Sequence, residues 1–570
     1  MAEEVWMLQT KKADFKQIGA RFRIDPVTAR IIRNRGIEGE AAIDRYLNGT
    51  LDDLYDPMLL KDMERAVSIL CEAVDTGKKI RIVGDYDIDG VCSTYILLQA
   101  FERLGSDVDF EIPDRIKDGY GINESIIEQA HADGVEVILT CDNGISAFHQ
   151  VGLAKKYGMT VVITDHHEVP LDGEKEKIPP ADAVIDPKQA DCPYPFPEIC
   201  GAVVAYKLVQ VLYARRGVPR MEWLDLLEFA AIATVGDVMK LQDENRILVK
   251  YGLKKMAQTK NLGLRRLAEK NNLDLGAITA YHIGFVIGPC LNAGGRLKTA
   301  KEALALLRAQ SEEEAERLAE ELKELNDTRK DMTEQGTEAA KLQVESWYQK
   351  DKVLVVFLPE CHESLAGIIA GRLREYYQKP AIVLTRGEEA VKGSGRSIDE
   401  YHMFKKLTEV SDLLLKFGGH PLAAGLSLEE KNIDEFRRRL NENAGLTEED
   451  FKAKVWIDVP MPVGYVTERL VRELSCLEPF GQGNEKPLFA EKSLRIRASR
   501  VLGRNRNVVK MTLEETDGHA IEALYFGDGT AFEEERAGRR EIDVVYYPDI
   551  NEYNGRKTLQ AVIRRYKFRG

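Results

Sequence analysis

Three aspartates alternate along the short stretch Asp85–Asp89, directly after a run of apolar residues. Carboxylates crowded in this way repel one another unless a cation neutralises them. Two further apolar runs also end in residues that bind metals, namely Asp142 and the triplet Asp165-His166-His167. The residue types and their spacing therefore predict a metal site.

The apolar runs predict the elements that position these side chains. Residues 80–84, 135–140 and 160–164 are short and apolar, as buried strands of a parallel sheet are. Open α/β sheets build their sites at the carboxyl ends of such strands. Asp237 follows a predicted buried helix over residues 223–234. We therefore expect Asp237 to join the acidic residues at one edge of the sheet.

A calcium loop is the main alternative interpretation of Asp85–Asp89, because Asp-x-Asp-x-Asp-Gly opens the EF-hand pattern. That pattern requires a preceding helix and a glutamate at the twelfth loop position. Here the preceding segment is a predicted strand and the twelfth position is Ile96. A solvated acidic turn would explain one such cluster, but not three at three strand ends.

Aspartate and histidine together suit Mn²⁺ or Mg²⁺, since imidazole shifts the preference of a carboxylate site towards Mn²⁺. A pair of ions needs one bridging carboxylate and several terminal ligands. The expected ligands are Asp87, Asp89, Asp142, His166 and Asp237. Such a site catalyses phosphoryl displacement, and the chain has neither a Walker A pattern nor a convincing dinucleotide fingerprint. We therefore expect hydrolysis of a phosphate ester.

His167 has three open roles. It can bind the second ion, orient a carboxylate ligand, or contact the phosphate of the substrate. The residues alone do not choose between these roles.

Composition is that of a globular protein with several domains. The chain has 570 residues, 44% hydrophobic and 31% charged, which predicts three or four domains. No apolar stretch approaches the length of a membrane span, and the acidic N-terminus lacks a signal-peptide core. The eight scattered cysteines include no Cys-x-x-Cys pair. We therefore expect a cytoplasmic protein with reduced thiols and without a zinc site.

Net charge is −14, which argues against nonspecific nucleic-acid binding by the whole chain. Basic residues nevertheless gather in residues 495–510 and 556–569. A local basic groove can bind phosphates even on an acidic protein. Exposed, solvated strand faces would give the same charge pattern, and both interpretations stay open.

The chain divides into five expected segments. Residues 1–75 predict a helical lead-in with helices over 41–47 and 63–72, and residues 76–300 predict a doubly wound α/β domain. Residues 301–345 are rich in helix formers and predict one long connecting helix. Residues 346–447 predict a second, smaller α/β domain. Residues 448–570 predict an OB-type β-barrel, with strands over 494–501, 508–513, 520–526, 542–547 and 558–564.

The motifs at the strand ends resemble those of the DHH phosphoesterase superfamily. They read Asp-Tyr-Asp-x-Asp-Gly, Asp-Asn-Gly and Asp-His-His. Within that superfamily the whole chain resembles a bacterial exonuclease branch specific for single-stranded DNA. Further similar segments are Leu54–Pro57, Arg115–Gly121, Gly201–Ala205, Thr234–Asp237 with Glu244–Arg246, Gly418–His420, Ala423–Gly425 and Leu477–Asn484.

The resemblance implies a DHH domain, a DHH-associated domain and an OB domain. It implies 5′→3′ hydrolysis of single-stranded DNA to 5′ mononucleotides with two Mn²⁺ or Mg²⁺ ions, in DNA repair and recombination. The same five ligands are implied, with Asp85 and His167 close by as catalytic residues. The implied substrate-binding residues are Arg115, Asn292, Arg296, Ser394, Arg396 and His420. The residue types also support phosphate binding independently of the resemblance, because guanidinium binds phosphate bidentately and a hydroxyl adds one hydrogen bond.

Two positions depart from the pattern of the superfamily. Cys290 stands where arginine is usual, and the segment Glu360–Ser364 lacks the usual tryptophan before His362 and the glycine two residues after it. Neither departure touches an expected metal ligand, so we expect catalysis to persist and the grip on substrate to change.

Partners and alternatives also follow from the resemblance. It implies single-stranded DNA as the main partner, with a single-strand-binding protein and a RecQ-type helicase as further ones, and the size allows a monomer. One alternative function is a DHH phosphodiesterase for short oligonucleotides or cyclic dinucleotides. Another is a non-catalytic DNA-binding relative, which would be expected to lose the acidic ligands.

Overall fold

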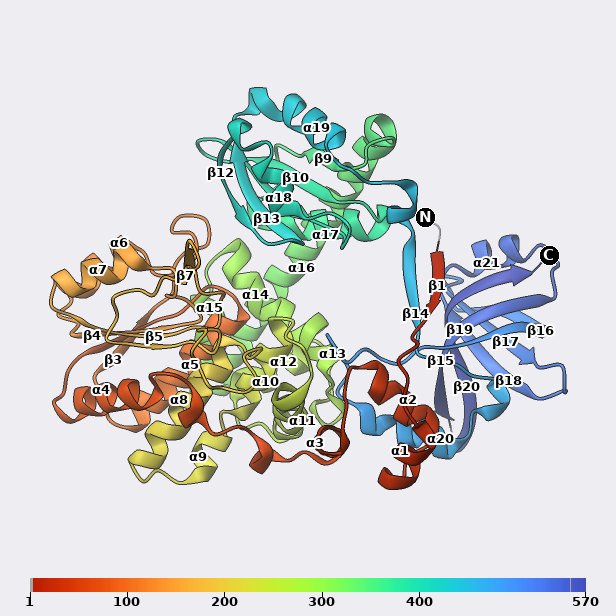
Figure 1. The fold of residues 1–570 in the computed structure, drawn as a ribbon, viewed down its shortest axis with the longest axis horizontal. Coiled ribbons are helices and arrows are strands. Elements are labelled where there is room, and N and C mark those ends of the chain that lie inside the picture. The colour runs from red at the N-terminus through yellow and green to blue at the C-terminus, as the bar shows by residue number, and fades with distance from the viewer. Residues whose placement is uncertain (1–3, 554, 570) are drawn as a thin grey trace. The chain divides into compact units, whose positions relative to one another are not determined.

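The computed structural model describes residues 4–553 and 555–569 and divides them into two compact units (Figure 1). The first unit holds residues 54–240 and 244–453, and the second holds residues 4–53, 241–243 and the chain from 454 onward. The expected lead-in is therefore divided between the two units, because residues 4–53 pack with the C-terminal segment. The boundaries of the five expected segments stay a prediction.

The first unit begins with a five-stranded parallel sheet in the order β3-β2-β4-β5-β8. Its strands are β2 (Ile80–Val83), β3 (Val108–Glu111), β4 (Val137–Cys141), β5 (Thr160–Thr164) and β8 (Ala183–Ile185). From β2 the chain moves outward to β3, and from β4 it moves outward in the opposite direction to β5 and β8. The crevice that this reversal creates at the carboxyl ends of β2 and β4 is the usual ligand site of a doubly wound sheet.

Helices cover both faces of this sheet, which confirms the predicted doubly wound class (Figure 1). One face packs against α6 (Glu124–Ala132) and α7 (Phe148–Lys156), through alternate strand residues such as Ile138 and Ile163. The other face packs against three helices, α4 (Met63–Asp75), α5 (Ile88–Arg103) and α8 (Gly201–Arg215). Because both faces are covered, the strands are apolar throughout rather than alternating.

The helical part that follows differs from the prediction in two places. The single helix expected over residues 223–234 is two helices, α9 (Arg220–Leu224) and α10 (Leu227–Gly236). Asp225 ends α9, and its carboxylate pairs with Lys255 of α11 (Asp243–Met256). The break therefore places a charged side chain outside the apolar helix α10, in which eight of ten residues are buried.

The long connecting helix expected over residues 301–345 is present, but it begins later than expected, at Glu312. The structure has α15 (Lys301–Arg308), a break, and then α16 (Glu312–Gln343). Ser311 starts the second helix, because its hydroxyl accepts a hydrogen bond from the Glu314 N–H at 3.2 Å. A serine cap followed by acidic residues is a strong helix start. Before α15 the chain forms α12 (Leu262–Lys270), α13 (Ala280–His282), the π-helical turn η4 (Ile283–Ile287) and α14 (Gly288–Leu297).

The second α/β part of this unit is a mixed five-stranded sheet in the order β12-β13-β11-β10-β9. Its strands are β9 (Leu354–Phe357), β10 (Ala381–Arg386), β11 (Val391–Arg396), β12 (Leu414–Gly419) and β13 (Ala423–Leu428). Only β9 and β10 are parallel to each other. α17 (Glu363–Tyr377) and α16 pack on one face, while α18 (Met403–Thr408) and α19 (Ile433–Glu442) pack on the other.

The second unit contains the predicted C-terminal strands. They are β16 (Phe489–Leu502), β17 (Val508–Glu514), β18 (Ala520–Phe526), β19 (Glu541–Tyr553) and β20 (Arg556–Arg569). β16 pairs with β17 and also with β19, so the strand pairings return to the first strand, as in an OB-like fold. Smaller elements are β1 (Glu4–Leu8), β14 (Ala453–Ile457), β15 (Val459–Pro460), α20 (Glu468–Leu474) and α21 (Gly529–Arg536).

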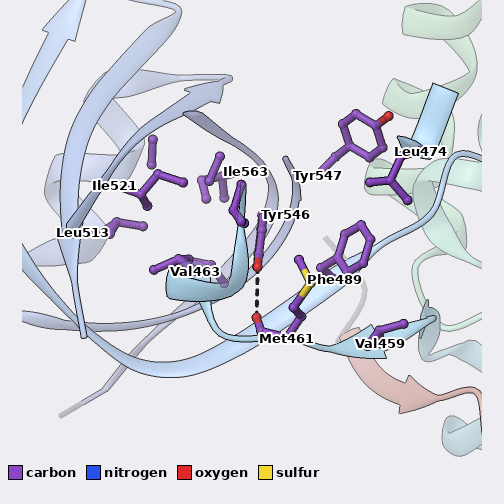
Figure 2. Packing of buried hydrophobic residues seen from close by; sticks show 14 of the residues in the cluster. Val459, Met461, Val463, Leu474, Phe489, Leu513, Ile521, Tyr546, Tyr547 and Ile563 are labelled. Carbon is purple, nitrogen blue, oxygen red and sulfur yellow. Dashed lines mark hydrogen bonds between the residues drawn. The ribbon is translucent and has the colours of Figure 1, made fainter. Parts of the chain in front are cut away.

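The core of the second unit lies inside these strands (Figure 2). Phe489 and Tyr546 gather there, and the Tyr546 hydroxyl donates a hydrogen bond to the Met461 carbonyl at 2.9 Å. The N-terminal helices α1 (Phe15–Phe22), α2 (Pro26–Asn34) and α3 (Glu40–Asn48) belong to this core, to which they contribute Ile31, Ile32, Ile43 and Tyr46. In the described part of the chain, no helix has both the length and the apolar character needed to span a bilayer.

Candidate metal centre and anion pocket

The crevice between β2 and β4 collects all seven residues that the sequence predicted for the metal centre. Their potential ligand atoms form three groups, within each of which the atoms lie within 4.8 Å of one another. The groups are Asp85 with Asp87 and Asp142, then Asp142 with His166 and His167, and Asp89 with His166 and Asp237. Shared members join the three groups into one cluster, as a site for two ions requires.

His166 stands at the middle of this cluster. Its Nε2 atom lies 3.1 Å from Asp142 Oδ1, 3.4 Å from Asp89 Oδ2 and 3.8 Å from Asp237 Oδ2. Burial is the main influence on the pKa of His166 and lowers it. The imidazole is therefore neutral near pH 7, which is the form that binds a metal.

Two helix N-termini point at the cluster. Asp87 caps α5, and its Oδ1 accepts hydrogen bonds from the N–H groups of Asp89 at 2.9 Å and Gly90 at 3.2 Å. The Asp89 carboxylate accepts hydrogen bonds from the N–H groups of Gly201 and Ala202, both at 2.7 Å, in the first turn of α8. The free N–H groups and the dipole at a helix N-terminus favour negative charge, so both helices hold the carboxylates in place.

Glycines allow the carboxylates to lie this close together. A side chain at Gly201 would place its Cβ 2.7 Å from Asp142 Cβ and 3.0 Å from Asp142 Oδ1. A side chain at Gly90 would collide with the backbone of Asp85. Asp142 itself has φ = 61°, a left-handed conformation that aspartate tolerates better than most residues. The motif glycines therefore provide space for the site.

His167 is held by two residues that were not among the predicted site residues. Its Nδ1 lies 2.8 Å from Asp165 Oδ1 and 3.0 Å from the Tyr120 hydroxyl, which also donates to the Asp142 carbonyl at 3.0 Å. Burial alone lowers the pKa of His167, but the hydrogen bond to Asp165 and nearby carboxylates raise it to about 9. Tyr120 lies in the segment Arg115–Gly121 and Asp165 in the Asp-His-His motif, yet their positions in the sequence do not predict this contact.

The cluster is unfavourable as a set of bare carboxylates. Burial, and then repulsion from Asp87, raises the pKa of Asp85 to about 8. Burial followed by repulsion from Asp89 raises the pKa values of Asp142 and Asp237 well above the ordinary range. The buried atom Asp142 Oδ1 has no hydrogen-bond partner in the described part of the chain. A polar atom left in this state inside a ring of carboxylates fits a bound divalent cation, and the oxygen-rich ligand set with one imidazole fits Mn²⁺ or Mg²⁺.

A pocket of about 290 Å³ lies in the same unit and collects most of the predicted substrate-binding residues. Its lining combines residues from the first sheet domain, α14, α17 and β11, namely Arg115, Arg296, Glu363, Ser364, Gly367, Ile368, Ser394 and Arg396. Arg396 Nη1 donates to Ser394 Oγ at 3.2 Å and to the Gly395 carbonyl at 2.8 Å.

The pocket is strongly positive. Burial, and then the charges of Arg115 and Arg329, lower the pKa of Arg296 to about 10. Burial and the charge of Arg115 also lower the pKa of Arg396. Guanidinium groups that depress one another's pKa in this way are stabilised by an anion. Guanidinium and hydroxyl donors together match the oxygens of a phosphate.

The pocket adjoins the acidic cluster. The Arg115 guanidinium lies over the ring of Tyr86, 4.7 Å from its centroid, within the loop that carries Asp85 and Asp87. Asp87 is also the carboxylate that acts on Arg296. α14 reaches this loop through Gly295, where a side chain would collide with the Tyr86 carbonyl. An anion in the pocket would therefore lie next to the expected metal ligands.

Two predicted substrate-binding residues do not line this pocket. Asn292 Oδ1 accepts a hydrogen bond from the Ile88 N–H at 2.8 Å, at the start of α5. His420 is exposed in the turn between β12 and β13. Cys290, at one of the two departures from the motif, is buried with its Sγ 3.4 Å from Asn326 Nδ2. Sequence reasoning did not find Glu363, Ser364 and Gly367, because their partners in the pocket are distant in the chain.

Three family models match consecutive parts of the chain. The DHH family N-terminal domain matches residues 79–234, the DHHA1 domain matches residues 350–445, and the RecJ OB domain matches residues 457–565. The order and approximate extent agree with the two α/β parts and the C-terminal strands described above.

Relatives are similar over nearly the whole chain. The single-stranded-DNA-specific exonuclease RecJ of Bacillus subtilis is 36% identical over 564 residues, which cover 98% of this chain and 70% of the relative. That of Escherichia coli is 34% identical, covering 95% of each chain. The crystal structure of Thermus thermophilus RecJ in complex with Mn²⁺ has a TM-score of 0.84 at 28% identity, covering 99% of this chain and 80% of that chain. The Mg²⁺ complex from the same organism has a TM-score of 0.78 at 27% identity, with coverage of 99% and 78%.

Proposed function

We propose, because the chain belongs to the RecJ family, that this protein is a 5′→3′ exonuclease specific for single-stranded DNA. It hydrolyses phosphodiesters from the 5′ end and releases 5′ mononucleotides. The observation that carries the proposal is the arginine pocket directly beside a metal-binding cluster. Such a pair of sites holds a terminal phosphate and cleaves at a fixed distance from it.

Arg115, Ser394 and Arg396 bind the 5′ phosphate in this proposal. Each hydrogen bond to a charged group stabilises the complex by about 1.5–3 kcal/mol. A bound terminal phosphate places the first phosphodiester over the acidic cluster, because the pocket adjoins the loop with Asp85 and Asp87. Positioning of this kind sets both the polarity and the length of the product.

The proposed metal ligands are Asp87, Asp89, Asp142, His166 and Asp237. These residues would hold two Mn²⁺ or Mg²⁺ ions, which when bound would supply Lewis acidity for phosphoryl displacement by water. The protein contributes the fixed carboxylates, because the N-termini of α5 and α8 hold Asp87 and Asp89 in place. Asp85 adds negative charge beside Asp87 and completes the cluster.

His167 contacts the scissile phosphate in this proposal. Its hydrogen bond with Asp165 fixes the ring and favours the protonated form, and the Tyr120 hydroxyl contacts the same ring nitrogen. A protonated imidazole stabilises the negative charge that develops on phosphate oxygens during displacement. This choice among the three open roles rests on the contacts of its ring.

The OB-like unit contributes further contacts to the DNA strand in this proposal. Some of its basic residues already form ion pairs, as Arg497 does with Glu514 and Lys510 with Glu522. Arg495, Arg500 and Arg504 are exposed on or beside β16. We assign DNA contacts to these three, since an exposed cation releases counterions when it binds a phosphate.

The test is degradation of a 5′-phosphorylated single strand, a 5′-hydroxyl single strand, a blunt duplex and a dinucleotide, each with Mn²⁺ and with Mg²⁺. We expect turnover of the phosphorylated single strand and little of the duplex. Preferred turnover of the dinucleotide would instead support a phosphodiesterase for short oligonucleotides or cyclic dinucleotides. Asp142→Ala abolishes activity if Asp142 is a metal ligand, and Asp172→Asn, on the exposed two-residue strand β6 (Leu171–Asp172), is the matched control. Near-normal activity of Asp142→Ala contradicts the assignment.

The proposal also covers the protein partners and the oligomeric state. A single-strand-binding protein and a RecQ-type helicase are the expected partners, and the expected state is a monomer. Light scattering of the purified chain, alone and after addition of each partner, tests both expectations.

A further inference from the structure

The N-terminus of α17 forms one wall of the anion pocket. Four residues of its first turns line the pocket, namely Glu363, Ser364, Gly367 and Ile368. The helix begins at Glu363 and runs for 15 residues. The first N–H groups of a helix have no partner within the helix, and its dipole favours a negative charge at this end. α17 therefore adds to the positive potential of the pocket.

α17 lies directly on the two β11 residues that are assigned to the phosphate. A side chain at Gly367 would place its Cβ 2.8 Å from Ser394 Oγ and 2.9 Å from Arg396 Nη2. Ser364, one helical turn earlier, is tied to the opposite side, because Arg296 Nη1 donates to its carbonyl at 3.0 Å. The helix that carries Ser364 therefore contacts Arg296 of α14 and packs on Ser394 and Arg396 of β11.

The Ser364 hydroxyl has a fixed partner of its own. His362 Nδ1 lies 2.8 Å from Ser364 Oγ, and Ser364 is only 7% exposed. A serine hydroxyl has one donor hydrogen and can accept two hydrogen bonds. When the His362 Nδ1–H donates to this hydroxyl, the serine hydrogen is free to donate to a third group. The pocket is the space that both the serine and the helix N-terminus face.

We propose that His362 and Ser364 form a hydrogen-bonded pair that recognises the terminal phosphate monoester of the substrate. Ser364 donates its hydroxyl hydrogen to a phosphate oxygen opposite Ser394, and His362 orients that hydroxyl as a positioning residue. The proposal rests on the proposed function of the pocket and extends it to α17. It makes the pair a determinant of the preference for a 5′-phosphorylated end.

Glu363 is the one acidic side chain in the pocket lining. Its carboxylate lies 3.8 Å from Lys392 Nζ on β11, so a neighbouring cation offsets part of its charge. The remaining negative charge weakens the attraction of the arginines for the phosphate. Neutral hydrogen-bond donors therefore contribute more to phosphate binding in this pocket. The hydroxyls of Ser364 and Ser394 are such donors.

A double-mutant cycle tests the pair. The variants are Ser364→Ala, His362→Phe and the double variant, with Ser411→Ala as the control in the same α/β part outside the pocket. The measurement is the KM for a 5′-phosphorylated single strand and for the same strand with a 5′-hydroxyl, together with the inhibition constant of inorganic phosphate. Thermal melting of each variant verifies that it is folded.

We expect Ser364→Ala to raise the KM for the phosphorylated strand about 10- to 100-fold, the effect of losing one hydrogen bond to a charged group. The KM for the 5′-hydroxyl strand stays unchanged, and inhibition by phosphate weakens by a similar factor. His362→Phe has a smaller effect in the same direction. The double variant behaves like Ser364→Ala alone, because His362 acts only through Ser364.

Three results would contradict the proposed role of His362 and Ser364. One is an unchanged preference for the phosphorylated strand in Ser364→Ala. Another is an equal loss on both strands, and the third is a double variant whose loss is the product of the two single losses. A wild-type protein that degrades no single strand refutes the proposed function instead. In that case, calorimetry of inorganic phosphate binding replaces the inhibition constants. We expect Ser364→Ala to lower the affinity for phosphate most and His362→Phe to lower it less.

Discussion

Removing the charge of Asp85 should stabilise the metal-free protein while it weakens metal binding by the neighbouring carboxylates. Asp85 is 2% exposed, and its pKa is raised from 3.8 to about 8 by burial and by the charge of Asp87. The folded protein therefore binds the Asp85 proton more tightly than the unfolded chain does. Its contribution to stability is fully present below about pH 4 and is lost as the pH rises towards 8.

The size of the effect follows from these two pKa values. Each pH unit between them costs about 1.4 kcal/mol, so ionising Asp85 in the metal-free fold costs on the order of 5 kcal/mol. Asp85→Asn keeps the shape of the side chain and removes this cost. For a domain of about 200 residues, we expect the melting temperature at pH 8 without metal to rise by roughly 10 °C. At pH 4 the variant and the wild type should melt together.

The assay is thermal melting from pH 4 to pH 8.5, in chelator and in excess Mn²⁺, with Asp172→Asn as the exposed control. In Mn²⁺ the order should reverse, because binding to the folded state stabilises the wild type and the variant has lost part of the site. The reasoning is refuted if Asp85→Asn is no more stable than the wild type at pH 8 in chelator. It is also refuted if the difference between the two does not grow with pH.

Three other perturbations test the surroundings of the site. Tyr120→Phe removes a hydroxyl that contacts His167, and we expect kcat to fall about 10-fold with KM unchanged, as measured by steady-state kinetics. Glu363→Gln removes the one acidic charge of the pocket lining, and the KM for a 5′-phosphorylated strand should fall about two- to fivefold; a rise in KM would contradict this. Gly201→Ala pushes a methyl group against Asp142, so we expect metal affinity, measured by calorimetry, to fall at least about 10-fold.

Local pattern was sufficient for the elements that carry the metal ligands. The strands at 80–84, 135–140 and 160–164 are continuous apolar runs, and a run of that length followed by Asp or His has few other interpretations. Parallel strands bring their carboxyl ends to one edge, so the sheet class predicts that the residues after β2, β4 and β5 lie together, whereas Asp237 joins them from the end of the helix α10. The same reasoning failed at residues 309–311, because one serine cap outweighs the helix propensity on either side.

The sequence by itself determined the acidic cluster, because most of the expected metal ligands lie just after strands that local pattern identifies. Only tertiary structure brought the residues of the anion pocket together. Its lining comes from Arg115, Arg296, the start of α17 and β11, which meet because α14 packs against both α5 and α17, and α17 packs on β11. Residue spacing contains no record of such contacts. Family resemblance supplied three arginines and one serine of the pocket, and only the fold added His362 and Ser364 beside them.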